Sequence, residues 1–338
     1  MKTVTIAGGG VAGLALGVAL RQRQVPVTVL EAGTYPRHRV CGEFLCGRGA
    51  QLLEALGLGS LESEAVRHRQ TGWYVKGRNV LAGTLPKTAL GISRHTMDVR
   101  LAEHFQALGG ELCTQARAPR DFGGEGQVRA TGRQIDRASD WLGLKLHVHA
   151  LATRENLEVH LGAGGYVGVS AVEAGAVNVC GLFRKRDAMD GRGVALMLGY
   201  LRACGLDALA RRIEQAEPEA ASVVGISHFS FGQAQEPQAA VGDALTVIPP
   251  FTGNGMSMAL EAAWQAAPVL EAYARRRTTW PESQLRLRRV LGRNFRRRVR
   301  WARGTQTMLL LPWTRTGLSL CARGGVFPFQ TLFRLTHS

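Results

Sequence analysis

The chain has 338 residues, 45% of them hydrophobic, and a net charge of +16. This hydrophobic content is ordinary for a globular protein with a full core, and no apolar run is long enough to span a bilayer, which excludes a membrane-spanning helix. The six cysteines form no Cys-x-x-Cys pair and no repeating framework, which indicates reduced thiols in a cytoplasmic protein.

Residues 3–31 are predicted to form a strand, a glycine turn, a helix and a second strand. The turn, residues 8–13, has the G-x-G-x-x-G pattern, in which the glycines allow a tight turn, close approach of a pyrophosphate and close helix–strand packing. The helix N-terminus suits a phosphate, and an acid at the end of the second strand suits a ribose. Three consecutive glycines exclude a secretory signal peptide. We expect a dinucleotide, NAD or FAD, to contact Gly8, Gly10, Val11, Ala12, Gly13, Glu31 and Ala32.

The following residues alternate between helices and strands. Thr96 is the expected N-cap of the clearest helix, whose apolar face carries Leu101 and Phe105. The predicted elements are a helix over residues 47–56, a strand pair over 70–83, a helix over 96–108, a strand over 111–113 and a polar linker over 119–126.

Residues 142–183 have the pattern of an antiparallel sheet, in which apolar residues from Leu144 to Val148 alternate with polar ones. His147 and His149 lie on one face of a strand and either line a pocket, bind a metal or form a packed, hydrogen-bonded pair; without ligand spacing we expect no metal. The remaining predictions are helices over residues 188–215, strands over 223–231 and 239–243, and helices over 256–273 and about 282–303.

The stretch from Gly242-Asp243 to residue 261 includes Pro-Pro-Phe-Thr-Gly-Asn-Gly-Met. With the N-terminal glycine motif and Glu31, it resembles the FAD-dependent oxidoreductases that include aromatic hydroxylases and geranylgeranyl reductases, over most of residues 1–275. A helix that begins there stabilises the negative charge that a flavin ring gains on reduction. The resemblance implies FAD as the cofactor, with contacts from Gly242, Asp243, Pro250, Gly253, Asn254, Gly255 and Met256.

Residues 36–43 resemble the Pro-x-x-x-x-Cys-Gly element of the geranylgeranyl reductase branch, which lies beside the flavin. The resemblance implies a catalytic contact for Cys41; the alternative is a buried small residue in a tight turn. Arg39 either neutralises a cofactor phosphate or is solvated. Residues 94–98 resemble the family's Arg-x-x-Leu-Asp helix start, which implies that Arg94 reaches the cofactor.

One position departs from the family pattern. The family usually carries Ala-Asp-Gly after the middle linker, where this chain has Thr131 in place of the aspartate. That aspartate is linked to both FAD and nicotinamide nucleotide binding in the hydroxylases. FAD therefore stays the expected cofactor, and the electron donor is left open between NAD(P)H and another donor.

Residues 275–303 hold 12 arginines and one acid, Glu282. Leu287, Leu291 and Phe295 form one stripe of an amphipathic helix, and an apolar tail that includes residues 326–333 follows it. The helix either packs on the FAD domain with a solvated basic face or docks on an anionic membrane, which suits a lipophilic substrate. No nucleic-acid partner is expected, because no binding motif accompanies the charge.

The predicted fold is α/β, with a Rossmann-like FAD-binding domain, an inserted antiparallel β-sheet substrate domain and a helical C-terminus. The expected function is monooxygenation of a hydrophobic small molecule, an aromatic or polyketide-like compound. The alternatives are reduction of a carbon–carbon double bond in a polyprenyl lipid, and a non-catalytic flavin-binding protein. By family analogy the domains are 1–62, 88–140 and 235–280 for FAD, 63–87 and 141–234 for substrate, and 281–338 for the basic C-terminal region.

Overall fold

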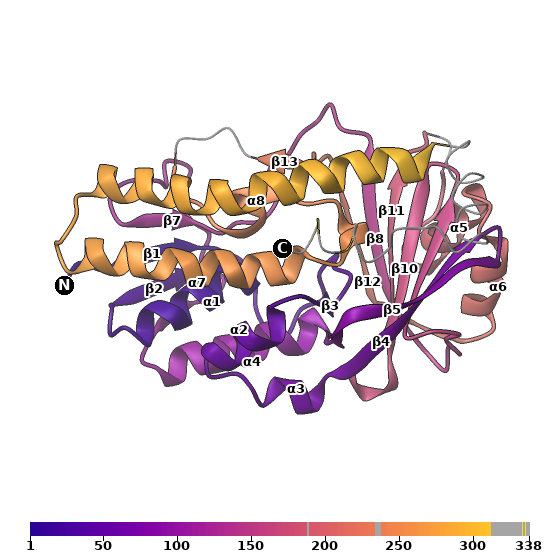
Figure 1. Cartoon of the computed structure of the whole chain (residues 1–338), viewed down its shortest axis with the longest axis horizontal. Coiled ribbons are helices and arrows are strands. Elements are labelled where there is room, and N and C mark those ends of the chain that lie inside the picture. Colours follow the sequence, from indigo (N-terminus) through magenta and orange to yellow (C-terminus); the bar gives the residue numbers. More distant parts are fainter. Residues whose placement is uncertain (188, 234–237, 312–332, 334, 336–338) are drawn as a thin grey trace.

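The computed structural model describes residues 1–187, 189–233 and 238–311, together with residues 333 and 335. A parallel sheet and a larger, mostly antiparallel sheet lie toward opposite ends of the molecule (Figure 1). The predicted α/β class is therefore confirmed, whereas the domain boundaries stay predictions. Most of the apolar tail expected after residue 311 lies outside the described residues.

The glycine motif belongs to the parallel sheet, whose strand order is β6-β2-β1-β7. Helix α1 (Val11–Arg21) follows the first strand, and α4 (Arg94–Ala107) and α7 (Gly255–Ala274) pack against it. Because parallel strands end at the same edge of a sheet, the glycine turn and Glu31 lie side by side. The strands are β1 (Val4–Ala7), β2 (Val27–Leu30), β6 (Glu111–Cys113) and β7 (Gln127–Arg129).

The larger sheet has the order β12-β8-β11-β10-β9-β4-β5-β3, and its neighbours are antiparallel except β4 and β9. Helices α5 (Gly193–Ala203) and α6 (Asp207–Glu214) share a core with the apolar residues Leu144, Leu146 and Val148. The strands are β3 (Phe44–Leu45), β4 (Val66–Val75), β5 (Arg78–Gly91), β8 (Trp141–His149), β9 (Leu157–Gly162), β10 (Gly165–Ala171), β11 (Val177–Arg184) and β12 (Glu217–Ser227).

Short elements connect these layers and shape the edge of the site. They are the helices α2 (Gly49–Ala55) and α3 (Leu61–Glu64), the strands β13 (Gly232–Gln233) and β14 (Thr246–Val247), and the 3₁₀ turns η1 (Glu173–Gly175), η2 (Gly242–Ala244) and η3 (Pro250–Thr252).

Three details of the sequence prediction are wrong. Ser93, not Thr96, caps α4: its Oγ accepts from the Thr96 N–H at 3.0 Å. The strand predicted over residues 223–231 is β12, which begins and ends earlier. The strand predicted over residues 239–243 is a single parallel bridge at Ala240, because Gly242 has a φ of +63° and ends the extended backbone.

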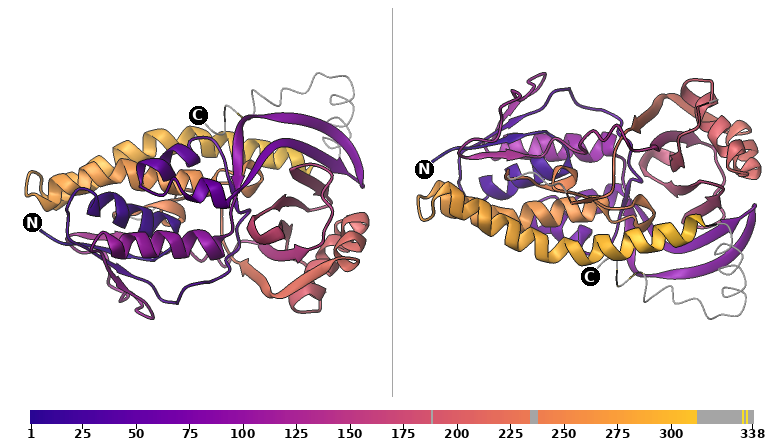
Figure 2. Two further views of the ribbon diagram at one scale, coloured as in Figure 1. Left: turned by 90° about the horizontal axis from the view of Figure 1, so that it is seen from below. Right: turned by 90° about the horizontal axis from the view of Figure 1, so that it is seen from above.

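Helix α8 (Trp280–Leu310) begins with a capping box of Thr279 and Glu282 and runs along the molecule toward the larger sheet (Figure 2). Its apolar stripe is buried in the core that α1 and α7 share, so the helix packs on this part of the molecule. Contact of its basic face with a membrane stays a prediction. None of the helices within the described ranges is long and apolar enough to cross a membrane. The buried stripe residues are Leu287, Leu291, Phe295, Val299 and Ala302.

Candidate functional site

Residues of both sheets line a cavity of about 1060 Å³ that extends from the glycine turn to the larger sheet. Its size is at the upper end of the roughly 300–1,000 Å³ that small-molecule sites have. Gly13, Gly242 and Asn254 are not among the described residues of its wall. The predicted residues that line it are Gly8, Gly10, Val11, Ala12, Glu31, Ala32, Arg39, Cys41, Arg94, Asp243, Pro250, Gly253, Gly255 and Met256.

The glycine turn leaves room beside the N-terminus of α1. Gly8 has a φ of +107°, and a Cβ on Gly13 would collide with the carbonyl oxygen of Gly8, so both positions require glycine. At Gly10 a Cβ would meet only the Arg94 guanidinium, 3.3 Å away, and would point into the space beside the helix end. This cradle, with the N–H groups of the first helical turn, fits a pyrophosphate.

Glu31 is buried at the end of β2 and keeps its charge. Its carboxylate accepts hydrogen bonds from the backbone N–H groups of Gly9 and Gly33 at 2.8 and 2.9 Å, and Arg39 Nη2 lies 3.3 Å away. Burial alone would raise the pKa of Glu31, but the bond from Gly33 and the charge of Arg39 bring it below its ordinary value. Glu31 is therefore an ionised acceptor at the wall of the cavity.

Arg94 and Asp98 form a two-bond ion pair at the start of α4, in which Nε and Nη2 each lie 2.7 Å from a carboxylate oxygen. Arg39 Nε also contacts Asp98, at 3.2 Å. Burial would lower the pKa of Arg94, but the Asp98 carboxylate raises it, so the guanidinium stays charged. The pair holds a fixed positive group beside Gly10.

Asp243 lies on the cavity wall next to the first turn of α1, since a Cβ on the preceding Gly242 would lie 2.6 Å from Ala12 Cβ. It pairs with Arg133, whose Nε is 2.9 Å from Asp243 Oδ2. Arg133 also lies over the ring of Phe229, with 5.0 Å between guanidinium and ring centre. The sequence did not single out Arg133, although it follows Thr131 and Gly132, which line the cavity as well. Thr131, which replaces the family's aspartate, is thus two residues before Arg133.

The N-terminus of α7 reaches the cavity through Gly255 and Met256. The preceding Gly253 has a φ of +65°, and its carbonyl oxygen accepts from the Cys46 thiol at 3.1 Å. Because the N-terminal end of a helix carries partial positive charge, this end can stabilise negative charge inside the cavity.

Cys41 lines the cavity in its thiol form. Burial raises the pKa of Cys41, although the nearby Arg94 opposes the shift. Cys180 on β11 also lines the cavity, and burial raises its pKa to about 12. Both groups are therefore protonated at neutral pH and weak as nucleophiles. A catalytic contact for Cys41 stays a prediction.

The part of the cavity under the larger sheet is apolar. Tyr166 closes it: its hydroxyl donates to Gln306 Oε1 at 3.0 Å and accepts from the Phe251 N–H at 3.1 Å. Its polar atom is thereby satisfied, and the ring faces an apolar wall. The other apolar residues of this wall are Trp73, Leu85, Leu157, Val159, Leu182, Ile226, Phe229 and Leu309.

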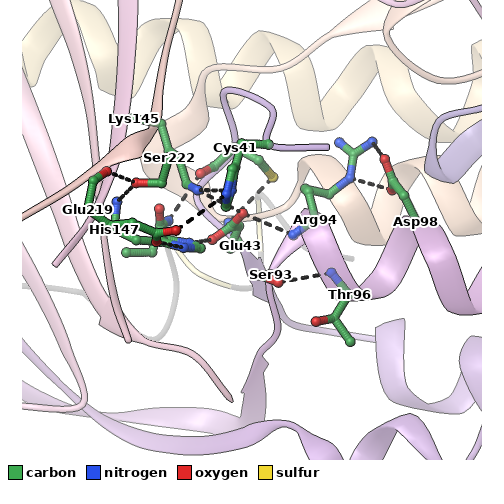
Figure 3. Close-up of polar contacts among 12 residues, drawn as sticks. Cys41, Glu43, Ser93, Arg94, Thr96, Asp98, Lys145, His147, Glu219 and Ser222 are labelled. Atoms are coloured by element: carbon green, nitrogen blue, oxygen red, sulfur yellow. Dashed lines mark hydrogen bonds and ion pairs between the residues drawn. The ribbon is translucent and has the colours of Figure 1, made fainter. Parts of the chain in front are cut away.

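The sequence did not reveal a buried cluster around Glu43, which also lines the cavity (Figure 3). Glu43 Oε2 lies 2.5 Å from His147 Nε2, and Lys145 lies beside them. His147 is hydrogen-bonded, but its partner is Glu43 and not His149 as in the histidine pair that the sequence suggested. The signal that the sequence carried was the alternation of polar residues with apolar ones along this strand.

The molecule has the fold of the FAD-dependent monooxygenases, halogenases and geranylgeranyl reductase-like proteins. The predicted fold is therefore confirmed. A geranylgeranyl bacteriochlorophyll reductase-like protein from Thermoplasma acidophilum superimposes with a TM-score of 0.74 and 17% identity, over 96% of this chain and 91% of that one. p-Nitrophenol 4-monooxygenase from Pseudomonas putida superimposes with a TM-score of 0.73 and 15% identity, over 99% of this chain and 97% of that one. PqsL of Pseudomonas aeruginosa, in complex with 2-aminobenzoylacetate, superimposes with a TM-score of 0.72 and 16% identity, over 94% of this chain and 99% of that one.

Sequence similarity to curated proteins is weaker. The menaquinone reductase of Mycobacterium tuberculosis is 27% identical over 119 residues, which are 34% of this chain and 29% of that protein. The chain thus matches under a third of the length of this relative. No family model matches the chain.

Proposed function

We propose that the protein is an FAD-dependent oxidoreductase that oxygenates a hydrophobic aromatic or polyketide-like compound. The observation that carries this proposal is the continuity of one cavity, from the glycine cradle at Gly10 to the apolar wall around Trp73 and Phe229. A dinucleotide fits the polar end, and an apolar substrate fits the other. Solved proteins with this fold include one that is named p-nitrophenol 4-monooxygenase.

The residues present fit FAD. The cradle beside Gly10 receives the pyrophosphate, Glu31 accepts from ribose hydroxyls, and Arg94 lies close enough to neutralise phosphate charge. Asp243 accepts from hydroxyls of the sugar chain. When bound, FAD would supply two-electron redox chemistry. The chain itself supplies positive potential from the N-terminus of α7 and an apolar wall that excludes water.

Reduction of a carbon–carbon double bond in a polyprenyl lipid is the second candidate. Cys41, which stands in the Cys-Gly element, lines the cavity. The curated relatives are named menaquinone reductases, and a geranylgeranyl reductase-like protein shares the fold. A third reading is a flavin-binding protein without catalysis.

The electron donor and the membrane contact are further parts of the proposal. NAD(P)H is the first donor to test, although Thr131 replaces the aspartate linked to nicotinamide binding. The face of α8 opposite its buried stripe exposes eight arginines together with Trp301, which is 45% exposed, and Met308, which is 59% exposed. Arginine and tryptophan suit the surface of an anionic bilayer, so we propose a cytoplasmic protein that docks there peripherally. The arginines are Arg286, Arg288, Arg289, Arg293, Arg296, Arg297, Arg300 and Arg303.

One experiment separates the three functions. Purified protein is titrated with FAD, reduced without oxygen by NADPH or dithionite, and mixed with oxygen and either apolar aromatic compounds or a polyprenyl quinone. A product heavier by one oxygen atom supports the proposal, and a polyprenyl quinone that stays heavier by two hydrogen atoms after its quinol is reoxidised supports the reductase. Flavin that is bound, reduced and reoxidised without product supports the third reading. A protein that takes up no FAD overturns all three.

A further inference from the structure

A buried polar cluster adjoins the cavity outside the dinucleotide motifs (Figure 3). At its centre Glu43 Oε2 lies 2.5 Å from His147 Nε2, and Glu43 Oε1 accepts from the Arg94 backbone N–H at 2.9 Å. Lys145 Nζ lies 3.5 Å from the same Oε1. The side chains of Glu43 and Lys145 are 0% exposed and that of His147 is 5% exposed, so these contacts form in a medium of low dielectric constant.

The polar groups of the cluster follow one another from the cavity wall toward solvent. Glu43 belongs to the cavity wall. On the other side of the imidazole, His147 Nδ1 lies 3.6 Å from Glu219 Oε2, and the Glu219 side chain is 36% exposed. His149, 41% exposed, lies 3.9 Å from the same oxygen. A carboxylate, an imidazole and a second carboxylate therefore follow one another from inside to outside.

The backbone at Glu43 indicates that its side chain is placed for a purpose. Its φ is +52°, in the left-handed region that glycine or asparagine usually occupies. Such strain in a residue with a long side chain persists where the surroundings fix it, and it gathers at functional sites. Here the Ile92 N–H binds the Glu43 carbonyl oxygen at 3.1 Å, which holds the side chain at the cavity wall.

The cluster is better suited to transfer protons than to bind a metal ion. His38, His147 and Glu219 offer three ligand atoms within 4.8 Å of one another. Lys145 Nζ, however, lies 3.1 Å from His38 Nδ1, and an ammonium donating there leaves the imidazole proton on Nε2, the nitrogen nearer Glu219. Burial, followed by the charge of Lys145, lowers the pKa of His38 to about 4, so His38 is neutral.

We propose that Glu43, His147 and Glu219 form a proton-transfer chain between the cavity and solvent, and that Glu43 is the group that exchanges a proton with the bound molecules. This inference rests on the proposed redox function, because each of its candidate reactions requires protons in a buried site. The charged and titratable groups around this proton-transfer chain are His38, Cys41, Arg94, His95, Lys145, His149 and Cys180.

The transfer balances one proton in and one proton out. Glu43 in its protonated form gives a proton to an acceptor in the cavity and becomes a carboxylate. His147 Nδ1 takes up a proton from water by way of Glu219, and the resulting imidazolium passes its Nε2 proton to Glu43 Oε2, so that the imidazole ends neutral in its other tautomer. The positive charge of Lys145 stabilises Glu43 while it is a carboxylate, and the opposite direction uses the same atoms.

The first test needs no cofactor. Protein labelled with ¹⁵N-histidine is prepared without FAD, and the exchange of the His147 Nε2 proton with water is followed by NMR. Glu219→Gln should slow this exchange at least about tenfold, because the route to water is cut. His160, whose Nε2 lies 2.7 Å from the buried Glu158, is the internal control and should exchange at an unchanged rate. Equal His147 exchange in both proteins would overturn the chain.

The second test uses the protein with FAD bound. Proton uptake from solution on reduction is followed with a pH indicator in a stopped-flow instrument. Glu43→Gln should slow uptake at least about tenfold, and imidazole should restore uptake in His147→Ala. The matched control is Glu158→Gln, which disturbs an equivalent buried glutamate–histidine pair that does not line the cavity.

The two tests separate the relay from the proposed function. Normal FAD binding with unchanged proton uptake in Glu43→Gln overturns the relay and leaves the redox function standing. Absence of FAD binding overturns the redox function, and the NMR experiment then decides whether the proton route exists. Circular dichroism shows whether Glu43→Gln folds; if it does not, Glu219→Gln, at a half-exposed position, carries both tests.

Discussion

Glu261 and Arg298 form a buried ion pair that joins α7 to α8, with 2.6 Å between Glu261 Oε2 and Arg298 Nη1. Their side chains are 8% and 7% exposed. Among the 12 arginines of residues 275–303, Arg298 thus turns inward while its neighbours on α8 face solvent. The basic helix is held in place by a specific charge pair as well as by its apolar stripe.

Removal of one partner of this pair should destabilise the protein strongly. Arg298→Met leaves the Glu261 carboxylate buried without its guanidinium, which typically costs about 3–5 kcal/mol. Urea unfolding measures the change. The control Arg297→Met, on the exposed neighbour, should change stability by less than about 0.5 kcal/mol. Equal losses in the two variants would show that the pair has no special role.

The stability of the larger sheet should depend on pH through Glu158. Burial would raise the pKa of Glu158, but hydrogen bonds from His160 and Arg212 lower it to about 2 in the folded protein. A carboxyl group with a depressed folded pKa stabilises the protein above its unfolded pKa, and this contribution fades as pH falls toward 2. Its size is on the order of 3 kcal/mol.

Glu158→Gln should therefore lose stability at pH 6, and its difference from the wild type should shrink between pH 4.5 and 2. Urea unfolding at several pH values measures this difference. Glu217→Gln, an exposed position on β12, is the control and should show little difference at any pH. A Glu158 effect that does not vary with pH would mean that packing, not charge, is lost.

Gly10→Val should yield a folded but colourless protein. The added side chain would occupy the cradle beside the N-terminus of α1 and exclude a pyrophosphate. The absorbance of bound flavin after FAD titration gives the result. Gly304→Val is the matched control, because Gly304 is an exposed helical glycine with open space around its Cβ position. A yellow Gly10→Val protein would place the cofactor elsewhere.

Asp243→Ala should weaken FAD binding more than it weakens the fold. The loss of a charged hydrogen-bond acceptor costs about 1.5–3 kcal/mol, or roughly ten- to a hundredfold in Kd. Titration with FAD monitored by flavin fluorescence measures the affinity, and thermal unfolding monitors the fold. Asp140→Ala, at an exposed ion pair with Arg184, should leave FAD affinity unchanged. Unchanged affinity in Asp243→Ala would remove this residue from the site.

The exposed face of α8 should bind anionic vesicles in a salt-dependent manner. Each arginine near such a surface contributes about 1 kcal/mol, and the Debye length falls from about 10 Å at 0.1 M salt to about 3 Å at 1 M. Changing Arg289, Arg293, Arg296 and Arg300 to glutamine should reduce co-sedimentation with these vesicles at low salt. Protein that stays in the supernatant at low salt would show that the basic face is only solvated.

The glycine motif, and the strand β1 and helix α1 that it connects, could be predicted because their signals are local. Gly8 and Gly13 occupy positions where another residue would be strained or would collide, and the neighbouring strands are rich in β-branched residues. The first residue of α4 was harder to predict from the sequence, because Ser93 and Thr96 are both good N-cap residues. A distant residue decides between them: Glu173 Oε2 accepts from the Ser93 backbone N–H at 2.9 Å, which fixes Ser93 at the cap.

The buried cluster could not be predicted, because its members come from distant segments. Glu43 and His147 are 104 positions apart and meet only when the residues after the cis Tyr35–Pro36 bond fold back on β8. The alternating pattern of β8 predicted an apolar face and a polar face. In the structure Lys145 and His147 of the polar face are buried as well, because His38 and Glu43 cover them.

The path of the chain makes the dinucleotide cradle a late product of folding. The Lys2 N–H binds the carbonyl oxygen of Ala274 at 2.8 Å, and α7, which ends there, covers α1. Between these two points the chain leaves the parallel sheet, builds the larger sheet and returns. When only the glycine motif has been synthesised, the helix α7 that later covers α1 does not yet exist. Contacts between segments so far apart in the sequence form slowly. Until α7 is made, the apolar surface of α1 that α7 covers is exposed in the growing chain, and chaperones recognise such surfaces.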